Sequence, residues 1–161
     1  KRIFTGEHYV DPAVFRYDNT WWMFYTTPLN DALNLYYADE LTGDWKPHPL
    51  NPIVKLNKHI ARPGGRVLVH DGRLYRFTQD TEPIYGIQVF AFEIEKLSKT
   101  AYKERIVSEK PVIMKSGEGW NAYGMHHVDP QIMNGYWIAA VDGRCAPSSK
   151  IPCQPSSSRK K

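Results

Sequence analysis

One pattern occurs three times along this chain: an apolar strand, a two-residue polar turn and a second strand, which is rich in aromatic residues. The three units cover residues 13–25, 66–77 and 130–140. Their turns are Asp18-Asn19, Asp71-Gly72 and Asn134-Gly135. Asp-Gly and Asn-Gly are strong hairpin signals, because both central residues of such a turn must tolerate positive φ. The sequence therefore predicts three β-hairpins.

Further strand candidates follow the first two hairpins. Residues 34–38 and 41–45 would add a third and a fourth strand to the first unit. Residues 87–94 and 102–107 would do the same for the second unit. Helical periodicity is nearly absent, and only residues 93–102 could hold a turn or two of helix.

The spacing of the turns indicates the architecture. The turns at residues 18, 71 and 134 lie 53 and 63 residues apart. A period of about 50 residues made of four antiparallel strands is typical of a propeller blade. A β-sandwich or barrel would also show short strands and turns, but would not require the internal similarity. We therefore predict an all-β fold, a partial β-propeller of four-stranded antiparallel blades, with about two and a half blades in this chain.

An incomplete ring leaves blade faces and strand edges to be covered, because propellers contain about four to eight blades. The chain could belong to a longer propeller, several copies could complete the ring, or the sheets could form an open stack. Among these arrangements we favour self-association.

Composition separates a folded part from a tail. We expect a propeller-like domain over residues 1–143 and a flexible Pro/Ser/Lys-rich tail over residues 144–161. The tail holds five basic residues and no acidic one, which leaves 16 basic against 17 acidic side chains elsewhere. The net charge of +4 therefore gives no reason to expect a nucleic-acid partner. Cys145 and Cys153 also lie in the tail, where they could close a small disulfide loop.

Several functional classes lack their sequence signals. No apolar run approaches the roughly 20 residues of a membrane-spanning helix. Residues 1–10 lack the apolar core of a signal peptide, so we assign no localisation. Phosphate loops, dinucleotide fingerprints, nucleophile elbows and metal-ligand spacings are absent, and we expect neither a cofactor nor a metal. Aromatic residues make up 13% of the chain and would suit either a core or a sugar-binding surface.

Candidate site residues come from the segments that open each hairpin, because the innermost strands of a propeller begin near its axis. These segments are residues 8–12, 61–66 and 123–130. In the first, Asp11 could serve as the base or nucleophile of a glycosidase, or bind the backbone of its own turn before Pro12.

The second segment is basic. Arg62 and Arg66 flank Gly64-Gly65, which would let a ligand approach the backbone closely. Guanidinium groups there suit a carboxylate, sulfate or phosphate. Alternatively, Arg66 could pair between blades with an acidic residue such as Asp80.

Other candidates complete the predicted pocket. Gln79 and Asp80 could clamp neighbouring blades, or Asp80 could supply a second catalytic carboxylate. His126 and His127 are adjacent, so on a regular strand at most one would face the axis. Aromatic stacking on a sugar would come from residues such as Trp22 and Tyr85.

Longer stretches of the sequence resemble known propellers. Residues 11–15, 21–25, 35–39 and 41–45 resemble one blade of the five-bladed propellers of glycoside hydrolase families 43 and 32. Residues 45–52, 61–66 and 72–80 are similar to the domain that precedes the transferase domain in plant glucosamine inositolphosphorylceramide transferases. Related domains occur in bacterial proteins beside formyltransferase-like domains. The likeness covers residues 7–143, and the Arg-Pro-Gly-Gly-Arg stretch at 62–66 is its most specific part.

The resemblance implies a five-bladed propeller, whose hydrolase members carry two Asp and one Glu on the axis. Asp11 matches one of these positions, but the next two units have residues 62–65 and His126-His127 instead of carboxylates. We therefore expect a carbohydrate-active module that binds a glycan or sugar phosphate in an axial pocket. The alternatives are a glycoside hydrolase with Asp11 as base or nucleophile, and a scaffold for a neighbouring transferase domain.

Overall fold

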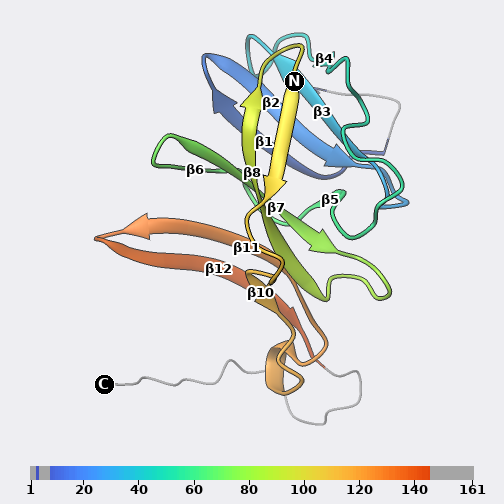
Figure 1. Ribbon diagram of the computed structural model, residues 1–161, viewed down its shortest axis with the longest axis vertical. Coiled ribbons are helices and arrows are strands. Elements are labelled where there is room, and N and C mark those ends of the chain that lie inside the picture. The colour runs from blue at the N-terminus through green and yellow to red at the C-terminus, as the bar shows by residue number, and fades with distance from the viewer. Residues whose placement is uncertain (1–2, 4–7, 146–161) are drawn as a thin grey trace.

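The computed structural model describes Ile3 and residues 8–145, which form three antiparallel sheets. In Figure 1 the first sheet lies in the upper part of the molecule, the second lies beside and below it, and the third lies lower still. In the described part of the chain, no helix has the length and apolar character needed to span a membrane. The predicted all-β class is confirmed.

The first sheet is a four-stranded blade in chain order. Its strands are β1 (Val10–Tyr17), β2 (Thr20–Thr26), β3 (Leu33–Ala38) and β4 (Lys46–Pro47). The prediction of a strand over residues 41–45 is wrong. A turn forms there, in which the Gly43 N–H donates to the Glu40 carbonyl at 2.9 Å, and the fourth strand follows it.

The second sheet has six strands that occupy four positions. They are β5 (Arg62–Pro63), β6 (Leu68–His70), β7 (Arg73–Asp80), β8 (Gln88–Leu97), β9 (Tyr102–Ile106) and β10 (Ile113–Met114). Both β5 and β6 pair with β7, and both β9 and β10 pair with β8, so the inner and outer strands are each interrupted once. Residues 93–102, which could have held a turn or two of helix, form none: residues 93–97 end β8, and Tyr102 begins β9.

The third sheet contributes two described strands. The short 3-10 helix η1 (Gly119–Asn121) precedes β11 (Gly124–Met133) and β12 (Tyr136–Arg144). Two four-position blades and one hairpin match the predicted partial propeller of about two and a half blades.

All three predicted hairpin turns form as expected. Both central residues of each turn have positive φ: Asp18 and Asn19, Asp71 and Gly72, and Asn134 and Gly135, with values between 48° and 80°. Positive φ at both positions is the mark of the type I′ turn, whose twist matches that of the flanking strands.

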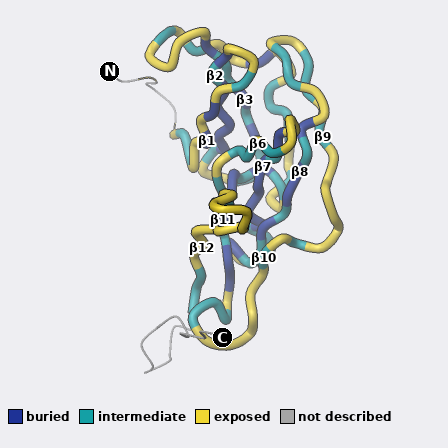
Figure 2. Tube along the Cα trace, turned by 90° about the vertical axis from the view of Figure 1, so that its left-hand side faces the viewer, coloured by how far each residue is buried: buried dark blue, intermediate teal, exposed yellow. Residues whose placement is uncertain are grey.

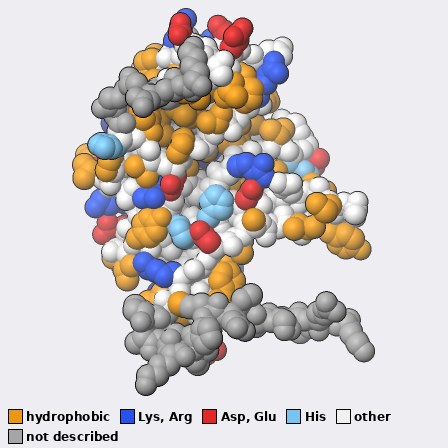
Figure 3. All heavy atoms as spheres, turned by 180° about the vertical axis from the view of Figure 1, so that it is seen from behind, with side chains coloured by type: hydrophobic (Ala, Val, Ile, Leu, Met, Phe, Trp, Pro, Cys, Tyr) orange, Lys and Arg blue, Asp and Glu red, His pale blue; other side chains and the backbone are white. Residues whose placement is uncertain are grey.

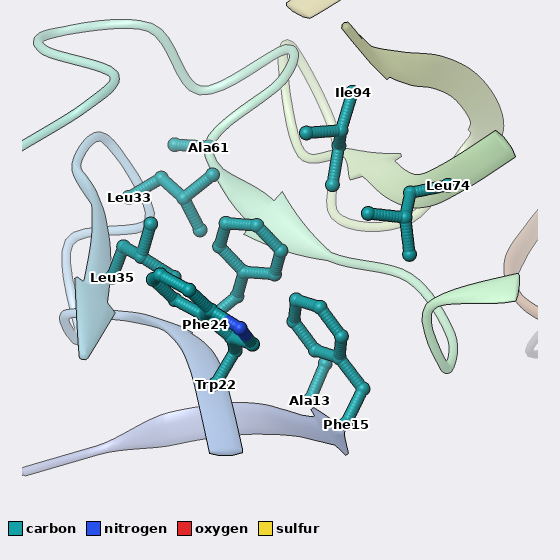
Figure 4. Packing of buried hydrophobic residues seen from close by; sticks show 9 residues of the cluster. All are labelled: Ala13, Phe15, Trp22, Phe24, Leu33, Leu35, Ala61, Leu74 and Ile94. Atoms are coloured by element: carbon teal, nitrogen blue, oxygen red, sulfur yellow. The ribbon is translucent and has the colours of Figure 1, made fainter. Parts of the chain in front are cut away.

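Aromatic side chains join the first two sheets. Phe15 and Phe24 stack with their ring centroids 5.5 Å apart. Trp22 lies in the same cluster, which also contains Leu74 and Ile94 of the second sheet (Figure 4). Burial of these side chains excludes water from the junction of the two blades and stabilises it.

A buried ion pair connects β7 with β9. The side chain of Arg76 is 3% exposed and donates to both carboxylate oxygens of Glu104. It also donates to the Ile60 carbonyl at 3.0 Å and lies 4.6 Å above the Phe92 ring. The Tyr102 hydroxyl donates to the same carboxylate at 2.5 Å. The charges are therefore compensated where water is excluded.

The β11–β12 hairpin projects from the rest of the molecule (Figure 1). Residues 131–142 are all exposed, as the end of the hairpin in Figure 2 shows. Large apolar side chains lie on it: Ile132, Met133, Tyr136, Trp137, Ile138 and Val141. Self-association through this or any other surface stays a prediction.

Candidate functional site

The three segments that open the hairpins line one pocket of about 520 Å³. Its polar lining residues include Asp11, Arg66, Gln79, Tyr85, His126 and His127. They come from β1, the segment between β5 and β6, β7, the loop after β7, and β11. Histidine, acidic and basic side chains gather near the middle of the face shown in Figure 3.

A β-bulge in β1 positions Asp11. The register with β2 shifts between Val10 and Ala13, and Asp11 has a φ of 46°. Bulges re-aim side chains at strand ends, and Asp is among the residues that tolerate positive φ. The Asp11 side chain is 44% exposed, and its Oδ2 accepts hydrogen bonds from Arg62 Nε and Gln79 Nε2, both at 2.8 Å. The carboxylate is therefore held in place at the pocket without being covered.

Arg62 supports this carboxylate from behind the pocket lining. Besides Asp11, its guanidinium donates from Nη1 to Asn30 Oδ1 at 2.8 Å and from Nη2 to the Tyr85 hydroxyl at 3.2 Å. It also lies 4.8 Å from the centroid of the Tyr85 ring. Burial raises the pKa of the Tyr85 hydroxyl above its usual value, so the group remains protonated at neutral pH.

Gln79 is buried, with 2% of its surface exposed. Its Nε2 donates to Asp11 and to the Pro63 carbonyl at 2.9 Å. Because both of these partners are acceptors, they fix which end of the amide is nitrogen. Gln79 Oε1 is then left without a hydrogen-bond partner among the described residues.

The two histidines both line the pocket, which corrects the expectation that only one could. The register of β11 with β12 shifts between Gly124 and His127, and this bulge breaks the strict alternation of side chains. His126 Nδ1 lies 3.0 Å from Asp142 Oδ1, and the His126 ring lies 5.2 Å from that of Tyr85.

Arg66 pairs with a neighbouring sheet, although not through Asp80. Its Nε lies 2.8 and 2.9 Å from the two carboxylate oxygens of Asp129, and its Nη2 is 2.8 Å from Oδ2. These hydrogen bonds raise the pKa of Arg66, which stays charged. Its side chain is 59% exposed and contributes to the pocket rim.

The glycines between the two arginines accommodate a strand. A Cβ on Gly65 would lie 2.0 Å from the Val128 carbonyl oxygen, and one on Gly64 would lie 2.8 Å from the Gln79 nitrogen. The Val128 N–H donates to the Gly64 carbonyl at 2.8 Å. Gly64-Gly65 therefore allows β11 to pack against the second sheet.

Besides Arg62, two sequence candidates lie away from the pocket lining. Asp80 is 3% exposed, and its carboxylate accepts from His59 Nδ1 at 2.9 Å, Gln88 Nε2 at 2.9 Å and the Glu82 N–H at 3.0 Å. Trp22 is 2% exposed in the core, with its indole N–H on the Tyr17 carbonyl. Neither side chain is presented to a ligand in this pocket.

Asp142 is a pocket residue that the sequence analysis missed, although a signal for it exists. A two-residue turn at Asn134-Gly135 fixes the register of the hairpin, and this register pairs His127 with Asp142. Extending the register back from the turn would have placed a carboxylate beside the histidines. Among the described residues, no group of three or more His, Cys, Asp or Glu is arranged to hold a metal ion.

Solved structures with a similar fold are glycoside hydrolases of family 43. Bacteroides ovatus Xyloglucan PUL GH43B matches 81% of this chain with a TM-score of 0.51 and 14% identity, and the match covers 23% of that protein. A thermostable family-43 glycoside hydrolase matches 78% of this chain with a TM-score of 0.48 and 12% identity, over 38% of its own length. The first of these supports the propeller fold.

Sequence relatives define the family. Glucosamine inositolphosphorylceramide transferase 1 of Oryza sativa subsp. japonica is 34% identical over 157 residues, which cover 92% of this chain. The protein of the same name from Arabidopsis thaliana is 32% identical over 152 residues, or 89% of this chain. The chain spans about a fifth of the length of these relatives, 21% and 20% respectively.

The resemblance drawn from the motifs is confirmed over nearly the whole described chain. The family described as "Glucosamine inositolphosphorylceramide transferase 1, N-terminal" matches residues 1–144. This chain, a partial propeller, belongs to that family of N-terminal domains.

Proposed function

We propose that this domain binds a glycan through the pocket at which its three hairpin openings meet. The observation that carries the proposal is the Asp11 carboxylate, which is half-exposed at the pocket while Arg62 and Gln79 hold its other side. Because the carboxylate is already held in position, little conformational entropy is lost when a ligand binds to it.

The chemistry of the lining suits a sugar. Sugar hydroxyls are hydrogen-bond donors, and Asp11 and the histidine rings offer acceptors at the pocket. Tyr85 adds an aromatic surface beside them. The relatives are named glucosamine inositolphosphorylceramide transferase 1. A domain that holds a glycan beside a transferase domain would fit that name.

Glycoside hydrolysis is the second candidate, and Asp142 is the observation that favours it. Glycosidases use a pair of carboxylates across the scissile bond, and both Asp11 and Asp142 line this pocket. However, Asp142 Oδ1 lies 3.0 Å from His126 Nδ1, and Asp11 Oδ2 already accepts from both Arg62 and Gln79. Both carboxylates are therefore held by protein partners, which suits fixed binding groups.

Isothermal titration with a panel of monosaccharides and plant-type oligosaccharides tests the proposal. We expect binding by the unmodified domain and at least a tenfold loss in Asp11→Asn, which keeps the shape but removes the charge. Asp39→Asn is the matched control, because Asp39 pairs with Lys99 at 2.7 Å and does not line the pocket.

The same panel separates the alternatives. Heat of binding with no turnover of nitrophenyl glycosides supports a binding module. Turnover that disappears in both Asp11→Asn and Asp142→Asn would establish a hydrolase instead. No binding to any sugar by the folded domain would refute the proposal and favour a scaffold.

A further inference from the structure

We infer that the pocket selects uncharged sugar units and excludes phosphorylated ones. This inference rests on the proposed function and narrows its ligand class, since an arginine-rich opening segment by itself would suit a phosphate. The distinction depends on where the two guanidinium groups of that segment are already engaged.

Arg62 has little capacity left for an anion. Its Nε, Nη1 and Nη2 each donate to a protein oxygen, namely Asp11 Oδ2, Asn30 Oδ1 and the Tyr85 hydroxyl. One face of the guanidinium also lies against the Tyr85 ring, 4.8 Å from its centroid. A phosphate would have to displace Asp11 to reach the fork of donors, and would leave that carboxylate without its cationic partner.

Arg66 is at the pocket rim, but its charge is compensated there. Both oxygens of Asp129 accept from its guanidinium, at distances of 2.8 to 2.9 Å. The pairing uses the bidentate geometry by which Arg would otherwise grip a phosphate. Only the outward N–H groups of Arg66 remain for a ligand.

The pocket-lining side chains other than the arginine are mainly hydrogen-bond acceptors. Asp11 and Asp142 line the pocket as carboxylates, and the rings of His126 and His127 line it beside them. A phosphate, which carries nearly two negative charges at neutral pH, would be repelled by both carboxylates. Arg144 does not line the pocket, and its Nη2 donates to the Tyr123 carbonyl at 3.5 Å.

Sugar hydroxyls have the complementary character, since each brings a donor without a charge. A neutral sugar can donate to the Asp11 and Asp142 carboxylates without disturbing either arginine pair. The pocket is therefore matched to an unphosphorylated sugar.

Paired ligands test the inference. Titrations would compare glucose, mannose and N-acetylglucosamine with the 6-phosphate of each, at pH 7 and low ionic strength. For at least one pair we expect the neutral sugar to bind ten or more times more tightly, and no 6-phosphate to bind better than its neutral partner. Inorganic phosphate should not compete.

A variant that removes the ion-pair partner of Arg66 provides a second test. Asp129→Asn removes the compensating charge and should raise the affinity for a 6-phosphate at least tenfold, while changing that for its neutral partner less than threefold. Asp44→Asn, an acidic residue outside the pocket lining, is the control. If the unmodified domain bound the 6-phosphates more tightly than the neutral sugars, this inference would be wrong but the proposed function would stand. If the folded domain bound no ligand of the panel, both would be wrong.

Discussion

Arg62 of β5 holds Asp11 of β1 through a hydrogen bond of 2.8 Å between Nε and Oδ2, so the second sheet orients the residue that opens the first. The two residues lie 51 positions apart in the chain. The arginine side chain is 14% exposed and the aspartate 44%, which leaves the carboxylate available and its support mostly covered.

This pair leads to the first prediction. Arg62→Lys keeps the positive charge but loses the planar fork that reaches Asp11, Asn30 and Tyr85 together. We expect affinity for a neutral sugar to fall about tenfold, or ~1.4 kcal/mol, as measured by titration calorimetry. Arg105→Lys is the control, because Arg105 pairs with Glu93 and Glu95 outside the pocket. Equal affinity in Arg62→Lys and the unmodified domain would mean that the fork does not position Asp11.

The second prediction concerns the junction between the second and third sheets. Gly65→Ala would place a Cβ 2.0 Å from the Val128 carbonyl oxygen, which cannot move without breaking the bond between the Val128 N–H and Gly64. We expect the free energy of unfolding in urea to fall by about 3 kcal/mol. Gly72→Ala meets no atom within 4 Å and is penalised only for its φ of 72°, by about 1 kcal/mol. Similar losses in the two variants would show that β11 does not need this close approach.

These sites show what the sequence could and could not predict. The turn at Asn134-Gly135 was predictable because a two-residue hairpin has a local signal. The Gly64-Gly65 pair is visible in the sequence, but its role is not. The role depends on Val128, which is distant in the chain and contacts the pair only in the folded domain. His126 and His127 share the pocket because of a bulge, and a single extra residue in one strand leaves no clear mark in the sequence.

Burial decided the roles of the aromatic and acidic candidates. Trp22 and Tyr85 were equivalent as sequence candidates for stacking, yet Trp22 packs in the core and Tyr85 lines the pocket. Gln79 and Asp80 were likewise adjacent candidates. The alternation of β7 separates them, and Gln79 reaches Asp11 while Asp80 is bound by His59 and Gln88. The strand was predictable, but the face that meets the pocket was not.

The third prediction is a pH dependence of stability. Packing around Tyr102 raises the pKa of its hydroxyl well above the usual value of 10, chiefly by removing it from water. Above about pH 10 the unfolded chain therefore releases this proton while the folded domain keeps it, and stability falls as pH rises. Tyr102→Phe should be less stable at pH 7 by about 1 kcal/mol, because it loses the hydrogen bond to Glu104.

The difference in the free energy of unfolding between the unmodified domain and Tyr102→Phe should then decrease between about pH 10 and 11, by up to ~1.4 kcal/mol per pH unit. Urea denaturation at each pH measures the gap. Tyr136→Phe is the control, since that side chain is exposed on the β11–β12 hairpin. A constant gap for Tyr102→Phe as well would contradict the raised pKa.

The last prediction separates structural from ligand-binding carboxylates. Asp80 is buried and accepts three hydrogen bonds, from His59, Gln88 and the Glu82 N–H. Asp80→Ala would remove three hydrogen bonds worth about 1 kcal/mol each, so we expect the free energy of unfolding to fall by about 3 kcal/mol. Because Asp80 does not line the pocket, sugar affinity at a temperature where the variant remains folded should stay within twofold. Asp11→Ala should show the reverse, with a larger loss of affinity than of stability. Loss of binding by folded Asp80→Ala would instead mean that this carboxylate acts at the site itself.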